Sequence, residues 1–298
     1  MDTPDVSLNI SREMLQHTRE LKVIAKNLDK KVRAELEKLL RDDREKYEAF
    51  WKAFGTQMKY GIVSNYGVDK DKLQDLLLFA SSAGERQTTL KEYRERMPEA
   101  QQFIYYASGE DANKLAKLPQ AERILDAGYE ILYLTEDVDE FTMQVLGEYD
   151  GKTIKSINAE DALPETEEEK KAAEEKAESG KAVLDFLKET LGERIKEARI
   201  SRILKSHAVC MVSDGPMSLE MEKYLRRQHA DMGGMQAERV LEINPDAPAF
   251  AALQSAMESD PEKAKKYAEL LYCQALLIAE LPLEDPSAYT DLVCSLMV

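Results

Sequence analysis

Arg12 and Gln16 are the two residues whose types and spacing could do chemistry. They are four positions apart, so a helix would present them on one face. Ser11 is a good N-cap and Glu13 brings negative charge to the first turn, so the sequence predicts a helix that begins near Arg12. A guanidinium can donate two parallel hydrogen bonds to a phosphate, and a carboxamide can orient a water or a phosphate oxygen beside it. From spacing alone, an ordinary capped helix with an exposed Arg and Gln is the simpler interpretation.

Six stretches of the chain carry a resemblance to a known family. They read SLNISREMLQ at 7–16, FWKAFG at 50–55, FIYYASGE at 103–110, YEILYLTEDVDEF at 129–141, DMGGMQAERVLEINPD at 231–246 and ALLIAELPLEDP at 275–286. In this order they resemble the middle and C-terminal domains of the heat-shock protein 90 family of ATP-driven chaperones, most of all the bacterial type. The resemblance implies that Arg12 and Gln16 are offered to the γ-phosphate of ATP. Ser7 stands where the family usually has Pro, so the loop before the helix loses a fixed φ angle.

The resemblance also implies what this chain leaves out. The family's nucleotide-binding domain would precede Arg12, so we expect a C-terminal fragment that is not an ATPase by itself. No Gly-rich phosphate loop follows a predicted strand. We therefore expect no cofactor in the fragment, and ATP with Mg in the full-length protein, whose own N-terminal ATPase domain is a partner. An acidic helical adaptor that binds defined partners without ATP is the alternative.

Composition and charge exclude several classes of partner. The 298 residues include 41 Lys and Arg against 57 Asp and Glu, a net charge of −16. Such a surface repels nucleic acid and anionic membrane, and no apolar run approaches the roughly 20 residues that span a bilayer. The cysteines are far apart in apolar contexts, which predicts reduced thiols in a cytoplasmic protein and neither a disulfide nor a metal site; they are Cys210, Cys273 and Cys294.

Apolar spacing predicts an α+β fold. Helices fill residues 11–61, and a further helix is expected around Leu73 to Ala80. Two short apolar strands, Phe103–Ala107 and Tyr129–Leu134, are separated by helical turns and predict a small α/β subdomain with a short, mostly parallel sheet. An α+β dimerisation domain ending in a helical bundle follows. The predicted parts are a helical segment at 1–66, the α/β subdomain at 67–162, a charged connection at 163–181 and the dimerisation domain at 182–298.

An apolar stripe follows Pro216 with the spacing i, i+4, i+7 and i+8. Its members are Met217, Met221, Tyr224 and Leu225. Core packing is the simple interpretation of such a stripe, although methionine also makes adaptable surfaces that fit many apolar partners. The resemblance implies that this helix projects into the cleft between protomers and contacts non-native client proteins. On that basis these four residues are candidates for client contact, together with Phe141 and Gln144 from the middle domain.

The last two helices predict a two-fold dimer. Apolar positions cover too much of the segment from Pro261 to Leu281 for one solvent-facing helix, and a short final helix carries its own stripe. Two such helix pairs would form a four-helix bundle, which is also the dimerisation mode that the resemblance implies. Docking of the final helix onto its own subunit is the competing interpretation. The candidate interface residues are Leu270, Leu271, Leu277, Ile278, Tyr289, Leu292, Val293 and Leu296.

Overall fold

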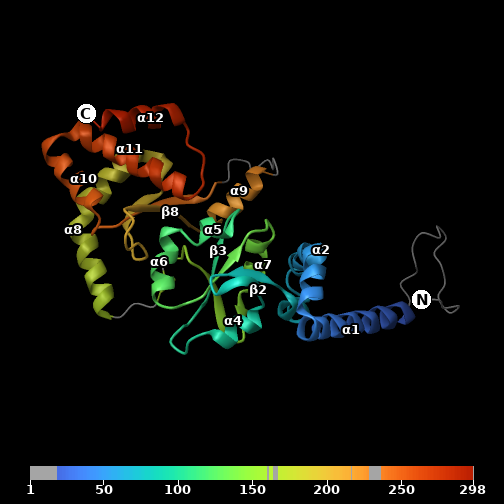
Figure 1. The fold of residues 1–298 in the computed structure, drawn as a ribbon. Helices are drawn as coiled ribbons and strands as arrows, with labels where there is room; N and C mark the ends of the chain where they lie inside the picture. Colours follow the sequence, from blue (N-terminus) through green and yellow to red (C-terminus); the bar gives the residue numbers. More distant parts are fainter. Residues whose placement is uncertain (1–18, 160, 164–166, 216, 228–235, 298) are drawn as a thin grey trace. The chain divides into compact units, whose positions relative to one another are not determined.

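The computed structural model describes residues 19–159, 161–163, 167–215, 217–227 and 236–297 (Figure 1). The chain divides into two compact units, one that ends at Leu78 and one that begins at Phe79. Helices are combined with two sheets that each mix parallel and antiparallel pairs, which confirms the α+β class. Arg12 and Gln16 lie outside the described residues.

The first unit is helical, with α1 (Arg19–Asp42), α2 (Arg44–Val63), α3 (Lys70–Leu73) and a 3₁₀ turn at Gln74–Leu76. The Asp43 side chain caps α2 by accepting from the Lys46 backbone N–H at 3.2 Å. Trp51 and Tyr47 are buried, and the Tyr47 hydroxyl donates to the Leu76 carbonyl oxygen. Tyr47 therefore ties α2 to the 3₁₀ turn, and the only Trp of the chain is buried in its unit.

The second unit begins with a six-stranded sheet in the order β2-β1-β4-β3-β6-β5. Its strands are β1 (Phe79–Ser81), β2 (Gly84–Thr88), β3 (Ile104–Ser108), β4 (Ile131–Leu134), β5 (Glu148–Tyr149) and β6 (Lys152–Ser156). At the centre β3 runs parallel to β4 and β6, whereas the β1–β2, β1–β4 and β5–β6 pairs are antiparallel. The sheet is thus mixed and not mostly parallel as the sequence predicted, because hairpins supply its outer strands. Asp150 and Gly151 both have positive φ, as a two-residue hairpin turn requires.

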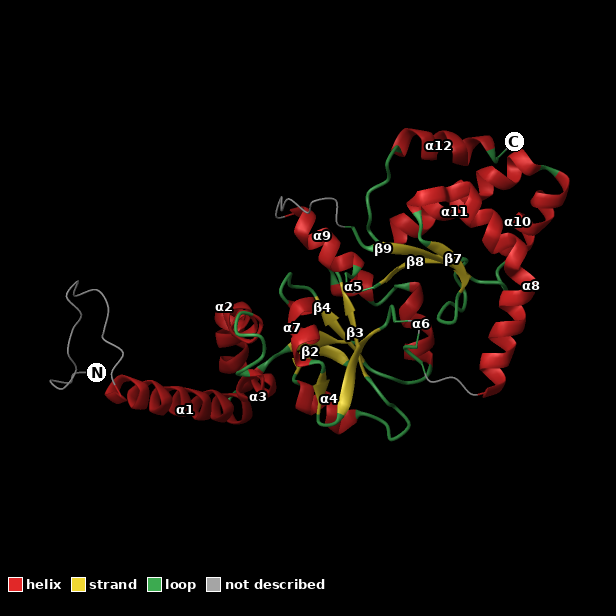
Figure 2. Cartoon of the chain, turned by 180° about the vertical axis from the view of Figure 1, so that it is seen from behind, coloured by secondary structure: helices red, strands yellow, loops and turns green. Residues whose placement is uncertain are grey.

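Helices cover both faces of this sheet: α4 (Leu90–Arg96), α5 (Ala112–Leu115), α6 (Pro119–Asp126) and α7 (Asp139–Leu146). Leu115 and Ile124 pack with Tyr105 and Tyr133, which share one face of the central strands. Tyr106 points to the opposite face, where its hydroxyl bonds to α7. Figure 2 shows α6 and α7 on opposite sides of β3 and β4. The central strands are therefore buried on both sides.

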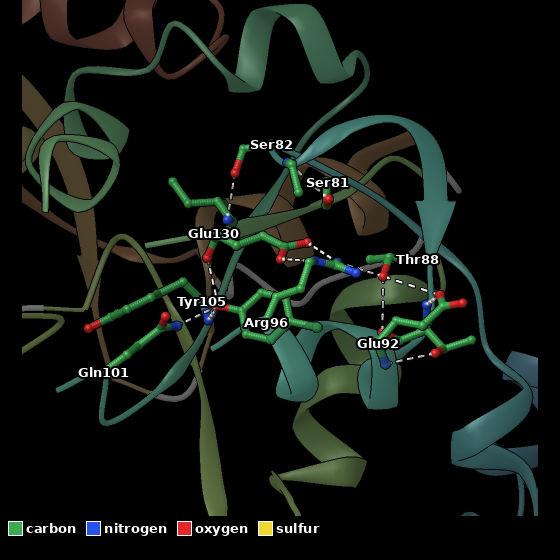
Figure 3. A network of polar contacts seen from close by, with 12 residues as sticks. Ser81, Ser82, Thr88, Glu92, Arg96, Gln101, Tyr105 and Glu130 are labelled. Atoms are coloured by element: carbon green, nitrogen blue, oxygen red, sulfur yellow. Dashed lines mark hydrogen bonds and ion pairs between the residues drawn. The ribbon is translucent and has the colours of Figure 1, made fainter. Parts of the chain in front are cut away.

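A polar network fixes α4 to the sheet (Figure 3). The Tyr93 hydroxyl donates to the Glu130 carbonyl oxygen at 2.6 Å. The same hydroxyl accepts from the Gln101 side chain at 2.7 Å and from the Tyr105 backbone N–H at 3.0 Å. Arg96 donates to both carboxylate oxygens of Glu130, at 3.0 and 2.7 Å. Since Tyr105 lies in β3 and Glu130 just before β4, the network holds α4 at the centre of the sheet.

The C-terminal part of the second unit packs helices on a three-stranded sheet. In this sheet β9 (Glu238–Ile243) lies between β7 (Glu197–Ile200), to which it is parallel, and β8 (Val209–Asp214), to which it is antiparallel. Leu187, Leu253 and Leu271 pack against Leu241 and Ile243 in one core. Leu187 comes from α8 (Glu167–Leu191), Leu253 from α10 (Pro248–Ser259) and Leu271 from α11 (Pro261–Ile278). From Glu167 onward, the predicted charged connection belongs to α8.

Two further helices complete the fold, α9 (Leu219–Arg227) and α12 (Pro286–Ser295). In both views α12 runs beside α11 at the C-terminal end of the chain (Figures 1 and 2). Asp285 caps α12 by accepting from the backbone N–H groups of Ser287 and Ala288, each at 2.9 Å. Among the described residues, no helix is both long enough and apolar enough to cross a membrane.

Candidate functional site

The structure brings four of the six predicted client-contact residues together, between α7 and α9. The rings of Phe141 and Tyr224 meet edge to face, with centroids 5.5 Å apart and an angle of 70°. Beside them Gln144 Nε2 donates to Met221 Sδ at 3.2 Å. Phe141 and Gln144 lie on α7, and Met221 and Tyr224 lie one turn apart on α9. We call these four residues the α7–α9 surface.

The other two predicted client-contact residues, Met217 and Leu225, take part in neither of these two contacts. Met217 precedes α9, is half-buried and packs against the core of the C-terminal part. Leu225 is also half-buried but does not line the cavity beside the surface. All four members of the predicted stripe are half-buried and none is fully exposed. The stripe therefore combines a packing role for Met217 with a place for Met221 on the cavity wall.

A small cavity of about 120 Å³ opens beside the α7–α9 surface. Phe141, Met221 and Tyr224 form its apolar wall. Its remaining wall is acidic and includes Glu110, Glu136, Asp137, Glu140 and Glu220. Arg227 donates to Glu110 at 2.7 Å and to Asp137 at 2.6 Å, so one cation offsets part of that charge. The site thus sets aromatic and thioether groups beside an acidic wall.

Glu140 is the buried carboxylate of this wall. It accepts from the Tyr106 hydroxyl at 3.1 Å and from the Ser108 hydroxyl, both on β3. Burial raises the pKa of Glu140, and these hydrogen bonds oppose the rise. Burial likewise raises the pKa of Glu220, to which the Glu140 charge adds while Lys223 opposes it. One carboxyl group from α7 and one from α9 thus line the same cavity, Glu140 buried and Glu220 half-buried.

Sequence reasoning missed this acid pair. Glu140 stands in the first turn of α7, where acidic residues are usual at any helix start. Nothing local separates a buried carboxylate from an exposed one in that position. Its hydroxyl partners Tyr106 and Ser108 lie more than 30 positions earlier. The burial of Glu140 therefore follows from the fold and cannot be predicted from the local sequence.

The predicted dimer residues are divided between exposed and buried positions. Leu271 packs in the core of its own subunit and is only 4% exposed, which leaves little of it for a partner. Leu277 is 47% exposed, and Leu270 and Ile278 are half-buried. On α12, no residue is buried; those that are half-buried include Tyr289, Leu292, Val293 and, just after the helix, Leu296.

A cavity of about 400 Å³ separates α12 from α11. Leu276, Leu283 and Leu292 contribute its apolar wall, and Tyr272 and Tyr289 add aromatic surface. The final helix therefore packs against α11 without filling the space between them. In the described structure the apolar stripe of α12 is only partly covered.

Comparison with known proteins decides the family. The family described as Hsp90 protein matches residues 1–298. The chain belongs to the Hsp90 family. It is 49% identical over 298 residues to the chaperone protein HtpG of Bacillus subtilis (strain 168). It is 48% identical over 297 residues to the proteins of the same name from Halalkalibacterium halodurans and Clostridium acetobutylicum.

Each of these matches covers 100% of this chain and 47% of the relative. The chain thus spans about half the length of the curated HtpG relatives it matches. Arg12 and Gln16 lie outside the described part of the chain. They are the two residues expected to contact ATP. No cluster of His, Cys, Asp and Glu suited to a metal ion occurs among the described residues.

Proposed function

We propose that this chain is the client-binding and dimerising part of an ATP-dependent chaperone of the HtpG kind. The observation that carries the proposal is its similarity, along its whole length, to proteins named chaperone protein HtpG. The α7–α9 surface supports it, because Met221, Phe141 and Tyr224 offer adaptable apolar groups. The acidic wall beside them suits non-native segments in which apolar and basic residues alternate. The three free cysteines fit the cytoplasmic location that we propose.

Suppression of aggregation tests this function. The chain is added to a thermally denatured client enzyme, and light scattering is followed with time. We expect scattering to fall as the chain approaches equimolar amounts, because apolar client segments are covered. An adaptor for defined folded partners would leave the scattering unchanged, and that result would contradict the proposal.

The catalytic part of the proposal concerns Arg12 and Gln16. They would stabilise the γ-phosphate of ATP, held with Mg on a nucleotide-binding domain outside this sequence. The chain alone should show no hydrolysis above background, and turnover should appear when it is mixed with the isolated nucleotide-binding domain. Arg12→Ala should lower that turnover about a hundredfold with little change in nucleotide affinity, because the guanidinium acts on charge in the transition state. Unchanged turnover would remove Arg12 from the site.

The structural part of the proposal is a homodimer built by α11 and α12. The exposed and half-buried apolar residues of these helices support it, as does the open cavity between them. We also propose that the boundary between the α/β subdomain and the dimerisation domain lies near residues 163–181.

A further inference from the structure

Glu222 is a buried carboxylate on α9 that does not line the cavity beside the α7–α9 surface. Its side chain is 0% exposed. Among the nine residues of α9, only Leu219 and Glu222 are buried. A helix this short is marginal by itself, so contacts with its neighbours hold it in place. The partners of Glu222 therefore matter for where the helix lies.

Both carboxylate oxygens of Glu222 are bonded, and two of the three donors lie outside α9. The Ala237 backbone N–H donates to Oε2 at 2.9 Å, and Arg239 Nη2 donates to Oε1 at 3.2 Å. Ala237 comes just before β9, and Arg239 belongs to it. Arg226, on α9 itself, pairs with Oε1 at 2.7 Å. Since charged donors make strong bonds to a buried carboxylate, Glu222 ties α9 to β9.

This tie fixes the rotation of α9 about its own axis. Successive residues of a helix point about 100° apart, so Met221 and Glu222 face different sides. With Glu222 held at β9, Met221 and Tyr224 face α7. There they contact Gln144 and Phe141. Rotation of the helix by one residue position would move both side chains away from α7, so their direction depends on the carboxylate on another face of the helix.

The other polar contacts of α9 are less deeply buried. Arg227 pairs with Glu110 and Asp137, but these side chains are 42%, 63% and 44% exposed, in that order. Water and salt screen such pairs, so they stabilise little. Lys223 donates to the Ala279 carbonyl oxygen at 3.1 Å, and this contact depends on one long, flexible side chain. The buried carboxylate is therefore the polar group of α9 best placed to fix the helix.

We propose that Glu222 is a positioning residue of the α7–α9 surface. It touches no client itself and holds α9 in the rotation that presents Met221 and Tyr224 to one. This role rests on the proposed client-binding function and adds to it the group that keeps the surface assembled.

Glu222→Gln tests the proposal, with Glu242→Gln as the matched control. Glu242 is only 2% exposed and is bonded by Arg199 at 2.8 Å, but it ties β9 to β7. Both substitutions should lower the thermal transition, because each takes the counter-charge from an arginine. A fluorescein-labelled ribonuclease A, kept unfolded by reduction and carbamidomethylation, serves as the client probe. Its affinity, measured by anisotropy, should fall about tenfold for Glu222→Gln alone; an equal fall in both variants would overturn the proposal.

The contact between Met221 and Gln144 gives a readout that needs no client. In the wild type, the Met221 methyl group should show a nuclear Overhauser effect to the Gln144 side-chain amide, because Sδ lies 3.2 Å from Nε2. Glu222→Gln should lose this signal, and Glu242→Gln should keep it. A wild type without the signal, or Glu222→Gln with it, would show that the proposal is wrong.

Two arginine variants extend the test if Glu222→Gln does not fold. Arg239 and Arg226 donate to the same oxygen, but only Arg239 lies on β9. Arg239→Gln should therefore weaken the Met221 signal, and Arg226→Gln should keep it. The opposite order would overturn the proposal.

Met221→Ser separates this role from the client-binding function. If Met221→Ser weakens binding of the unfolded ribonuclease and Glu222→Gln does not, the positioning role alone is wrong. If neither variant changes the affinity, the client site is wrong and the positioning role fails with it.

Discussion

The helices α9 and α12 carry similar apolar stripes but differ in what covers them. On α9, Tyr224 meets the ring of Phe141 and Met221 accepts from Gln144. On α12 no residue is buried, and a cavity of about 400 Å³ remains below it. An apolar helical stripe therefore predicts that the helix packs against another surface, but it does not identify that surface. For α9 part of the packing surface lies within the chain, whereas for α12 a second copy of the chain is the proposed partner.

The two surfaces also differ in charge. The cavity beside α9 has an acidic wall that includes Glu140 and Glu220. The cavity below α12 has acids and lysines at its edge, among them Glu269 and Lys265, so their charges offset each other around an apolar wall. The first surface is the proposed site for variable segments that carry positive charge. The second is the proposed site for the apolar face of a partner helix, and this contrast can be tested by breaking each surface in turn.

The largest effect is expected from removal of α12. By sedimentation equilibrium at micromolar concentration, the wild type should run near twice its 33.8 kDa monomer mass. A chain that ends at Leu283 should run as a monomer, because the short final helix supplies the uncovered stripe. A wild type at the monomer mass would contradict the dimer, and a dimeric truncated chain would place the interface elsewhere.

A point substitution should reproduce most of that effect. Leu292→Asp should raise the dimer dissociation constant about thirtyfold or more, because it buries a charge in an apolar interface. Thr290→Asp is the control, since Thr290 is exposed on the same helix, and it should change the constant much less. Equal effects of the two substitutions would show that the stripe of α12 does not form the contact.

A smaller effect is expected at the partner of α9. Phe141→Ala removes the ring contact with Tyr224 and should lower the free energy of unfolding by about 1–2 kcal/mol. Val293→Ala, on the partly covered stripe of α12, should cost less than about 0.5 kcal/mol in the dissociated chain. Urea unfolding at low protein concentration measures both. A larger loss of unfolding free energy for Val293→Ala than for Phe141→Ala would contradict the contrast between the two helices.

The smallest effect concerns pH. Burial raises the pKa of Glu140, so the folded state holds this proton more tightly than the unfolded state. Ionisation of Glu140 therefore costs no stability below the unfolded pKa, about 4.3, and lowers stability as pH rises toward the folded pKa. Glu140→Gln should gain stability relative to the wild type over that rise. The exposed Glu258→Gln on α10 is the control; a relative loss for Glu140→Gln as pH rises would contradict this sign.

Long-range pairing sets the limit of what the sequence predicted. The two central strands were found because each is a short, continuous apolar run. Ala80, expected in a helix, lies instead in the three-residue strand β1, which exists through its pairing with β4 and β2. Asp150–Gly151 is a hairpin signal that the sequence does carry, and it accounts for the antiparallel edge that was not predicted.

The candidate site shows the same limit. Helical spacing predicted that Met221 and Tyr224 share one face, and both residues do lie on the helix α9, one turn apart. Their partners Phe141 and Gln144 came from the family resemblance, since the contacts join positions about 80 residues apart. Met217 shares the stripe, but it lies before the helix begins and packs on the core. Spacing alone could not separate these two roles.

The affinity for a destabilised client tests the central claim most directly. Met221→Ser should weaken binding about tenfold with little change in the thermal transition, because Met221 is half-buried beside the surface cavity. Met217→Ser should lower the transition temperature more and affect binding less. Met58→Ser, at a half-buried methionine of α2, is the matched control. Unchanged client affinity for Met221→Ser, measured by fluorescence anisotropy, would contradict the assignment of the α7–α9 surface as the client site.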